Sequence, residues 1–267
     1  MKKYKLMVLS ILISFSLLAC SNSNTVVGNR NTTINIIATS NTSNTSNTSK
    51  YKWTNKTYIS IGDSISWQDK QKYPDSKETA KGYQSLLDEK IDFKNMTNYA
   101  IVGATMAKSS KYPNKASIMA SFLNENYTNS DIITIFAGTN DFKLNVPIGK
   151  IGNKKYDDST FYGSYEKFLD HILKQNKSVK IYLFTPLQRD NSGYDINKIN
   201  LAGSKLIDYV NAVKDIGRLY DLPVLDLYAT SGMDSSNLKH YTRDGLHPNQ
   251  DGYELITKPI LEFIEKN

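Results

Sequence analysis

The sequence predicts an α/β fold in which helices cover both faces of a central parallel β-sheet. Short, continuous apolar runs alternate along the chain with segments that have helical spacing. Continuous apolar runs are typical of strands buried on both faces, and consecutive parallel strands need crossover connections between them. The chain has 267 residues, of which 39% are hydrophobic. That content is sufficient for one sizeable core.

Five apolar runs are predicted to be strands. The clearest is 131–137, which contains three isoleucines and a phenylalanine and stops at Gly138. The run at 180–184 stops before Pro186, and proline and glycine are the residues that most often end such runs. The complete set of predicted strands covers residues 58–61, 97–100, 131–137, 180–184 and 224–227.

The segments between and after these runs are predicted to be helices, because their apolar residues recur at intervals of three and four. The predicted helices cover residues 82–90, 117–123, 161–175, 199–220 and 252–264. Residues 142–160 are polar and irregular and are predicted to form an inserted loop. The sequence assigns no role to that loop or to the loop at 187–198.

Turn-forming and polar residues follow the predicted strands. Gly62-Asp63-Ser64 ends the first strand, Gly103 follows the second, and residues 138–141 follow the third. The carboxyl ends of parallel strands meet at one edge of the sheet, which is where α/β proteins bind ligands. We therefore expect these segments to converge on one rim with the segment after Leu227, although they lie far apart in the sequence.

Asp244 and His247 follow the last predicted strand and are three residues apart, so they can lie on one turn. The carboxylate can then bond one imidazole nitrogen and leave the other as a general base. The hydroxyl of Ser64 is a poor nucleophile until such a base accepts its proton. Ser64, His247 and Asp244 are therefore the candidate catalytic residues.

Attack on a carbonyl creates a negative oxygen that needs hydrogen-bond donors already in position. The candidate donors of this oxyanion hole are the backbone amides of Ser64 and Gly103 and the side-chain amide of Asn140. Each candidate also has a simpler structural role open to it. Ser64 and Asn140 can cap helices, and Gly103 can be a turn glycine. His247 can be a structural histidine whose hydrogen bonds are satisfied. Asp63 and Asp141 flank the candidates and are predicted to organise the loops as hydrogen-bond acceptors.

These residues make the chain resemble the SGNH (GDSL-type) hydrolases. The four blocks of that family occur in order, with Ser64 in Gly62-Asp63-Ser64, then Gly103, Asn140, and His247 with Asp244. Ile65 stands where the name-giving motif has leucine, which is a conservative change. The resemblance implies a three-layer α/β/α flavodoxin-like fold and hydrolysis of esters through an acyl-serine intermediate, with no metal and no cofactor.

The N-terminal segment has the pattern of a secretory signal. Lys2, Lys3 and Lys5 precede an apolar run that is too short to span a bilayer as a helix. The run ends in Leu17-Leu18-Ala19-Cys20, which resembles the lipobox of bacterial lipoproteins. In those proteins the signal is cleaved before the cysteine, which is then lipidated. A plain secretory signal with a coincidental cysteine is the alternative.

Residues 21–50 are dominated by Asn, Thr and Ser and are predicted to be a flexible tether, because such a tract buries too little apolar surface to fold. The predicted organisation is a signal peptide at 1–19, the lipidated Cys20 with the linker at 20–50, and a hydrolase domain at 51–267. We expect the protein to lie outside the cytoplasm, lipid-anchored to a bacterial cell membrane.

Charge and cysteine content limit the other classes of function. Removal of Lys2, Lys3 and Lys5 with the signal takes the formal charge from +7 to +4. The rest of the chain has no dense block of Lys and Arg, so nucleic acid is not an expected partner. Cys20 is the only cysteine and there are three histidines, so a metal site has little support.

The sequence favours a cell-surface serine esterase that removes short acyl groups, with an O-acetylated polysaccharide as the expected substrate. Aromatic side chains that suit either stacking on sugars or packing at the rim follow several strands: Trp67, Tyr73, Tyr83, Tyr112 and Tyr241. Two alternatives stay open at this point: an esterase of lipids or lysophospholipids, and a non-catalytic lipoprotein that binds a solute or glycan. The oligomeric state stays open as well.

Overall fold

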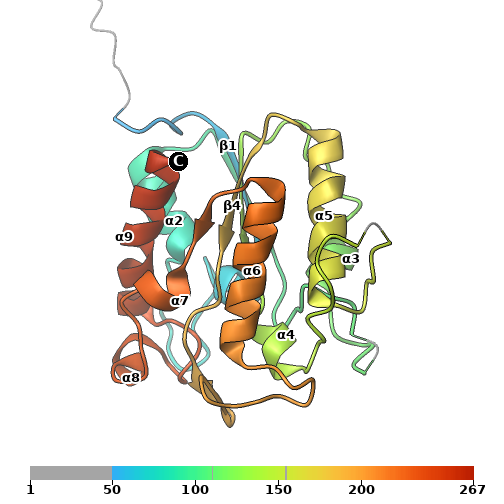
Figure 1. The fold of residues 1–267 in the computed structure, drawn as a ribbon. Helices are drawn as coiled ribbons and strands as arrows, with labels where there is room; N and C mark the ends of the chain where they lie inside the picture. The colour runs from blue at the N-terminus through green and yellow to red at the C-terminus, as the bar shows by residue number, and fades with distance from the viewer. Residues whose placement is uncertain (1–49, 110, 154) are drawn as a thin grey trace, which may run out of the picture. The chain divides into compact units, whose positions relative to one another are not determined.

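The protein folds around a five-stranded parallel sheet with the strand order β2-β1-β3-β4-β7 (Figure 1). A computed structural model describes residues 50–109, 111–153 and 155–267. The five strands are β1 (Thr57–Gly62), β2 (Asn95–Ala100), β3 (Ile132–Phe136), β4 (Lys180–Phe184) and β7 (Val224–Leu225). This is the flavodoxin-like order, and it confirms the predicted fold class.

Helices cover both faces of the sheet, as the sequence predicts. In Figure 1, α2 (Tyr83–Ile91) and α9 (Gln250–Lys266) lie together on one side. On the other side lie α3 (Ile118–Phe122), α5 (Phe161–Gln175) and α6 (Leu206–Tyr220). The structure is therefore a three-layer α/β/α arrangement.

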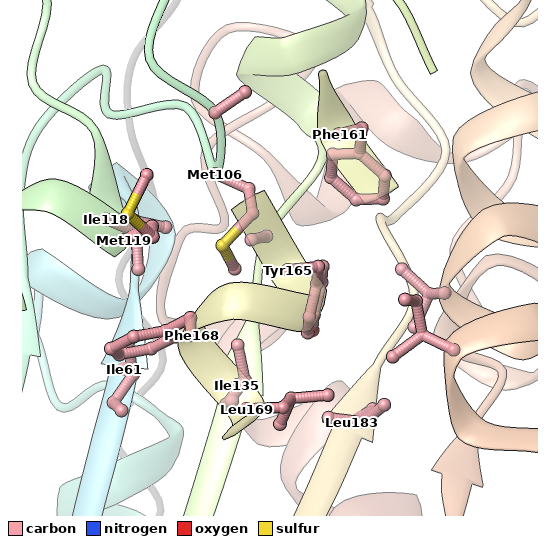
Figure 2. Close-up of a cluster of buried hydrophobic side chains, with 14 of the residues drawn as sticks. Ile61, Met106, Ile118, Met119, Ile135, Phe161, Tyr165, Phe168, Leu169 and Leu183 are labelled. Carbon is pink, nitrogen blue, oxygen red and sulfur yellow. The ribbon is translucent and has the colours of Figure 1, made fainter. Parts of the chain in front are cut away.

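The core is split by the sheet into two apolar clusters, because successive strand residues point to opposite faces. Ile133 and Ile135 of β3 join the cluster under α5 and α6, part of which is drawn in Figure 2. Ile132 and Phe136 of the same strand join the cluster under α2 and α9. A strand that is buried on both faces needs a continuous apolar sequence, which is why β3 was the clearest strand to predict.

The strand order brings three of the predicted site segments together. Gly62, the last residue of β1, is opposite Ala100 of β2 on one side and Phe136 of β3 on the other. β1 and β3 are neighbours in the sheet, and the strand order reverses between them, since β2 lies beyond β1 and β4 beyond β3. Such a point opens a crevice at the carboxyl edge of the sheet.

Two predicted elements are shorter in the structure by two residues or more at one end. The helix predicted over 199–220 begins only at Leu206, because Asn200 is held in a loop by a side-chain bond of 2.9 Å to the carbonyl of Phe142. The last strand ends at Leu225, and Leu227 begins α7 (Leu227–Thr230) with Asp226 as its N-cap.

Short elements that the sequence analysis did not predict surround the carboxyl edge of the sheet. They are α1 (Ser64–Trp67), α4 (Thr139–Lys143), α8 (Leu238–Tyr241) and a hairpin of β5 (Asp190–Asn191) and β6 (Tyr194–Asp195). The hairpin lies inside the loop 187–198, to which the sequence assigned no role. The loop predicted over 142–160 begins two residues later, because Phe142 and Lys143 complete α4, and residues 144–160 are irregular where they are described.

The predicted signal peptide, the lipobox with Cys20 and most of the linker fall on residues 1–49, which lie outside the described residues. Within residues 50–109, 111–153 and 155–267, no helix has the length and apolar character needed to cross a bilayer. The lipid anchor and the predicted domain boundaries stay predictions.

Candidate active site

Ser64 lies at the first position of α1, directly after β1. Asp63 is the N-cap of this helix, and its carboxylate accepts a hydrogen bond of 3.0 Å from the backbone amide of Ile65. Ile65 and Ser66 of α1 are buried, and the hydroxyl of Tyr253 in α9 donates a hydrogen bond of 2.7 Å to the carbonyl of Ile65. The position of Ser64 is therefore set by the sheet and by the packing of α9.

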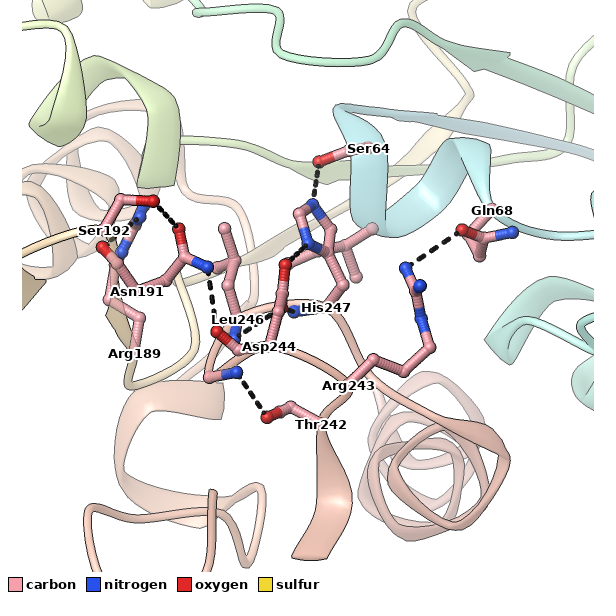
Figure 3. Close-up of polar contacts among 12 residues, drawn as sticks. Ser64, Gln68, Arg189, Asn191, Ser192, Thr242, Arg243, Asp244, Leu246 and His247 are labelled. Atoms are coloured by element: carbon pink, nitrogen blue, oxygen red, sulfur yellow. Dashed lines mark hydrogen bonds and ion pairs between the residues drawn. The ribbon is translucent and has the colours of Figure 1, made fainter. Parts of the chain in front are cut away.

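The hydroxyl of Ser64 meets the imidazole of His247, which is 183 residues away in the sequence (Figure 3). Ser64 Oγ lies 2.9 Å from His247 Nε2, and His247 Nδ1 lies 2.7 Å from Asp244 Oδ2. These are hydrogen-bond distances. The structure thus brings the three predicted catalytic residues together in the order hydroxyl, imidazole, carboxylate.

The loop that carries Asp244 and His247 is held by its own backbone and by the β5–β6 hairpin. Asp244 Oδ1 accepts hydrogen bonds from the backbone amides of Leu246 (3.1 Å) and His247 (2.8 Å), which closes the turn. From the hairpin, Asn191 Nδ2 donates to the carbonyl of Asp244 at 2.8 Å, and the amide of Asp190 donates to the carbonyl of Gly245 at 2.8 Å.

Gly245 is the one position in this loop where the backbone demands glycine. Its φ is +83°, and a Cβ there would lie 1.9 Å from the carbonyl oxygen of Asp190. A residue with a side chain would therefore be strained and would separate the loop from the hairpin.

The pKa values of the carboxyl groups at the site are shifted in opposite directions. Burial raises the pKa of Asp244, but its hydrogen bonds with the His247 side chain and backbone outweigh this, and the pKa falls below its usual value. Burial raises the pKa of Asp63 to about 6 and that of Asp141 to about 7. Asp244 is therefore suited to stabilise a protonated His247.

Asp63 and Asp141 organise the loops, as the sequence predicts. Asp141 accepts hydrogen bonds from the backbone amides of Met106 (2.8 Å) and Ala107 (3.2 Å) and so joins α4 to the loop that follows Gly103. The side-chain amide of Asn140 also donates to Asp63 Oδ2, over a longer distance of 3.4 Å. Neither carboxylate is placed as a base for Ser64.

Gly103 and Asn140, the other candidate donors, also have structural roles. Gly103 has a φ of +71° in a turn closed by a hydrogen bond of 3.1 Å from the amide of Ala104 to the carbonyl of Ile101, and this is a conformation that favours glycine. Asn140 Nδ2 donates to the carbonyl of Ala104 at 3.0 Å. This bond fixes the amide of Asn140 beside the Gly103 loop.

The predicted aromatic rim is only partly observed. Tyr83 is wrongly placed by the sequence analysis: it is fully buried, and its hydroxyl bonds to the hydroxyls of Ser60 (2.8 Å) and Ser66 (3.0 Å). Tyr73 is also buried. Trp67, three residues after Ser64 at the end of α1, is 39% exposed and can contact a ligand.

Sequence reasoning missed Arg189 and Asn191, which support the site from the hairpin segment. Arg189 is fully buried although it is charged. Its only signal in the sequence was its position, five residues after a predicted strand whose carboxyl end faces the same rim. Among the described residues, no group of three or more His, Cys, Asp or Glu side chains could hold a metal ion.

Comparison with known proteins shows which family the chain belongs to. A model of the GDSL-like Lipase/Acylhydrolase family matches residues 60–255, a span that contains Ser64, Asp244 and His247. The chain belongs to this family. Membership supports hydrolysis of an ester as the class of reaction.

Solved structures share the fold of this GDSL-like family member. A protein from Lactobacillus plantarum is 23% identical, with a TM-score of 0.67, and the match covers 80% of this chain and 98% of that one. The lipase/acylhydrolase from Enterococcus faecalis is 23% identical, with a TM-score of 0.51 and coverage of 79% and 96%. The aryl esterase of M. smegmatis is 14% identical, with a TM-score of 0.56 and coverage of 79% and 99%.

A curated relative is similar in sequence over part of its length. The N-acylneuraminate cytidylyltransferase of Escherichia coli is 26% identical over 191 residues, which is 68% of this chain. The matched stretch is 39% of that relative, so the chain spans well under half of its length.

Proposed function

We propose that the protein is a serine esterase that removes short acyl groups, and acetyl groups in particular, from carbohydrate. The observation that carries the reaction type is the continuous contact from Ser64 Oγ through His247 to Asp244, with distances of 2.9 and 2.7 Å. Membership of an acylhydrolase family supports the same reaction.

In the proposed mechanism, His247 Nε2 accepts the proton of Ser64 Oγ as the oxygen attacks the ester carbonyl. Asp244 stabilises the imidazolium, and His247 then donates the proton to the departing alcohol. Water activated by His247 attacks the acyl-serine and releases the carboxylic acid.

The oxyanion is held by the backbone amides of Ser64 and Gly103 and by the side chain of Asn140. The first amides of a helix have no partner within it, which leaves the amide of Ser64 available. One N–H of Asn140 is used by the carbonyl of Ala104, and the other makes only the contact of 3.4 Å to Asp63. A contact of that length is weak, so this second N–H is the one available to the oxyanion.

Two observations support a carbohydrate as the alcohol part of the ester. The exposed ring of Trp67 lies one helical turn after Ser64, where an amphipathic ring can stack on a sugar. The curated relative is named for N-acylneuraminate, a sugar acid. An acetylated polysaccharide is the proposed natural substrate.

We also propose that the enzyme is anchored outside the cytoplasm by lipid on Cys20. The support is the sequence pattern of Leu17-Leu18-Ala19-Cys20 after a short apolar run. More than one acyl chain on the cysteine would make the anchoring stable. Mass spectrometry of the N-terminal peptide from a bacterial membrane fraction tests this, and an unmodified Cys20 there would contradict it.

The test of function uses labelling and two kinds of substrate. We expect a fluorophosphonate to label the wild type at Ser64, nitrophenyl acetate to be cleaved faster than long-chain esters, and acetate to be released from an acetylated polysaccharide. A clear preference for long acyl chains would indicate a lipid esterase instead. Ligand binding without labelling or turnover would indicate a binding protein.

A further inference from the structure

Arg189 is the largest fully buried side chain of the described residues, and it lies between the two halves of the proposed active site. It precedes β5 and reaches toward α4. Transfer of a guanidinium out of water is costly unless every part of the group finds a hydrogen-bond partner. A buried arginine in a loop that the family motif does not include therefore needs a reason.

One end of the Arg189 fork holds the segment that carries Asn140. Nη1 donates to the carbonyl of Thr139 at 3.1 Å and to the Thr139 hydroxyl at 2.9 Å. Thr139 is the first residue of α4, and Asn140 follows it. These two bonds therefore fix the start of the helix from which the Asn140 amide projects.

The other end of the fork holds the hairpin. Nε donates to the carbonyl of Tyr194 at 3.3 Å, and Nη2 makes a weaker contact of 3.4 Å with the carbonyl of Asn191. The hairpin in turn holds the loop that carries Asp244 and His247, here called the catalytic loop. The side chain of Asn191 donates to the carbonyl of Asp244, and the amide of Asp190 donates to the carbonyl of Gly245. Figure 3 shows Asn191 reaching Asp244, with Arg189 on the far side of Asn191.

We infer that Arg189 is a positioning residue for the reaction: it joins the segment of the oxyanion donor Asn140 to the hairpin that places Asp244 and His247. All of its acceptors are uncharged oxygens, so their geometry, not a paired carboxylate, fixes the guanidinium. Lysine has no planar fork and cannot reach both ends together. The inference rests on the proposed function.

Electrostatics agrees with this placement. Burial lowers the pKa of Arg189 to about 10, while the charges of Asp63 and Asp244 act in the opposite direction and favour the cation. The cation in return favours the ionised form of Asp244, which His247 needs as its partner.

The experiment compares Arg189→Lys and Arg189→Met with Arg218→Lys and Arg218→Met. Arg218 is exposed and pairs with Asp215, so it is a matched control outside the site. Active sites are counted by fluorophosphonate titration, and kcat is expressed per titrated site. We expect Arg189→Lys to lower kcat by about 10–100-fold with little change in KM, because small misplacements of catalytic groups have effects of this size. Arg189→Met should lower kcat further.

A merely structural role predicts a different result. The melting temperature and the number of titrated sites would then fall, but kcat per site would stay at the wild-type value, and this outcome would overturn the inference. If the Arg189 variants do not fold, Thr139→Val and Asn191→Ala test each end of the link separately. Each should lower kcat per site by about 2–10-fold, the range expected for one hydrogen bond.

A double variant tests whether Arg189 acts through the hairpin. Arg189→Lys with Asn191→Ala should lose about as much kcat as Arg189→Lys alone, because both break one chain of contacts. Losses that multiply would contradict the link. Wild-type labelling at Ser64 is measured first. If it fails, the proposed function is overturned. If the wild type labels normally but kcat per site is unchanged in the Arg189 variants, only the role of Arg189 is overturned.

Discussion

The two halves of the active site are held in place by different means. Ser64 follows β1 after one residue, is 7% exposed, and begins α1, in which Ile65 and Ser66 are also buried. The side chains of His247 and Asp244 are 24% and 41% exposed, and their loop begins well after the last strand. Hydrogen bonds from the hairpin hold this loop. We conclude that the nucleophile is placed by the sheet and the base by contacts between loops.

This difference leads us to expect unequal responses to substitution. A larger side chain near Ser64 would disturb the core of the fold, whereas a change near His247 can disturb catalysis while the fold remains. The carboxyl groups show the same contrast, because Asp63 beneath Ser64 is buried with a raised pKa, while Asp244 is part-exposed with a lowered pKa.

The largest effect is expected from loss of the nucleophile. Ser64→Ala should reduce kcat by about 10⁴-fold or more, while Asp244→Asn should reduce it by about 10²–10⁴-fold, because the imidazole stays but loses its orienting partner. Turnover of nitrophenyl acetate measures both, and circular dichroism checks that the fold is kept. Near-normal turnover of Ser64→Ala would refute its assignment as the nucleophile.

The next effect is expected from loss of the side-chain oxyanion donor. Asn140→Ala should lower kcat by about 10²–10³-fold with a small change in KM, since the donor acts mainly on the transition state. Steady-state kinetics on the same ester measures this. Asn126→Ala, at an exposed position that bonds only to its own loop, is the control and should leave kcat unchanged. A change in KM alone would assign Asn140 to substrate binding.

Separation of the catalytic loop from the hairpin should have an intermediate effect. Gly245→Ala places a Cβ against the carbonyl of Asp190 and should lower kcat by about 10²-fold by moving His247. Gly203→Ala is the matched control, because Gly203 has a similar φ of +81° but no atom within 4 Å of the added Cβ. If both variants keep full activity, the hairpin does not position the base.

The smallest effect concerns stability and pH. Asp63 has a folded-state pKa of about 6 against an ordinary value of 3.8, so it favours folding most at low pH, and this stability is lost as the pH rises toward and past 6. Asp63→Asn should make the loss of unfolding free energy between pH 4 and pH 7 shallower by on the order of 1–3 kcal/mol.

Asp244 should behave in the opposite way. Its folded-state pKa is lowered, so it stabilises the fold above the ordinary carboxyl pKa, and that stability is lost as the pH falls. Asp244→Asn should therefore reduce stability near neutral pH more than at low pH. Urea unfolding at several pH values measures both variants, and parallel pH profiles for the two would contradict the contrast.

Features set by neighbouring residues could be predicted from the sequence. The strand at 180–184 and the helix at 161–175 have the predicted bounds, because the apolar run and the amphipathic spacing are local patterns. The residues proposed for catalysis could be named for a related reason: Ser64 lies at a strand end, and Asp244 and His247 lie on one turn.

Only the tertiary structure decided which of these residues meet and what holds them. The bonds of Arg189 to Thr139 and of Asn191 to Asp244 join residues 50 and 53 positions apart, and no local pattern reports such pairs. Burial is likewise collective, which is why Tyr83 belongs to the core and residues 199–205 form a loop despite their sequence. The sequence alone determined the parallel sheet and the chemistry available at its edge, because periodicity and residue type depend only on residues that are close together in the chain. The packing of distant loops determined the geometry, because hydrogen bonds and burial depend on all the neighbours at once.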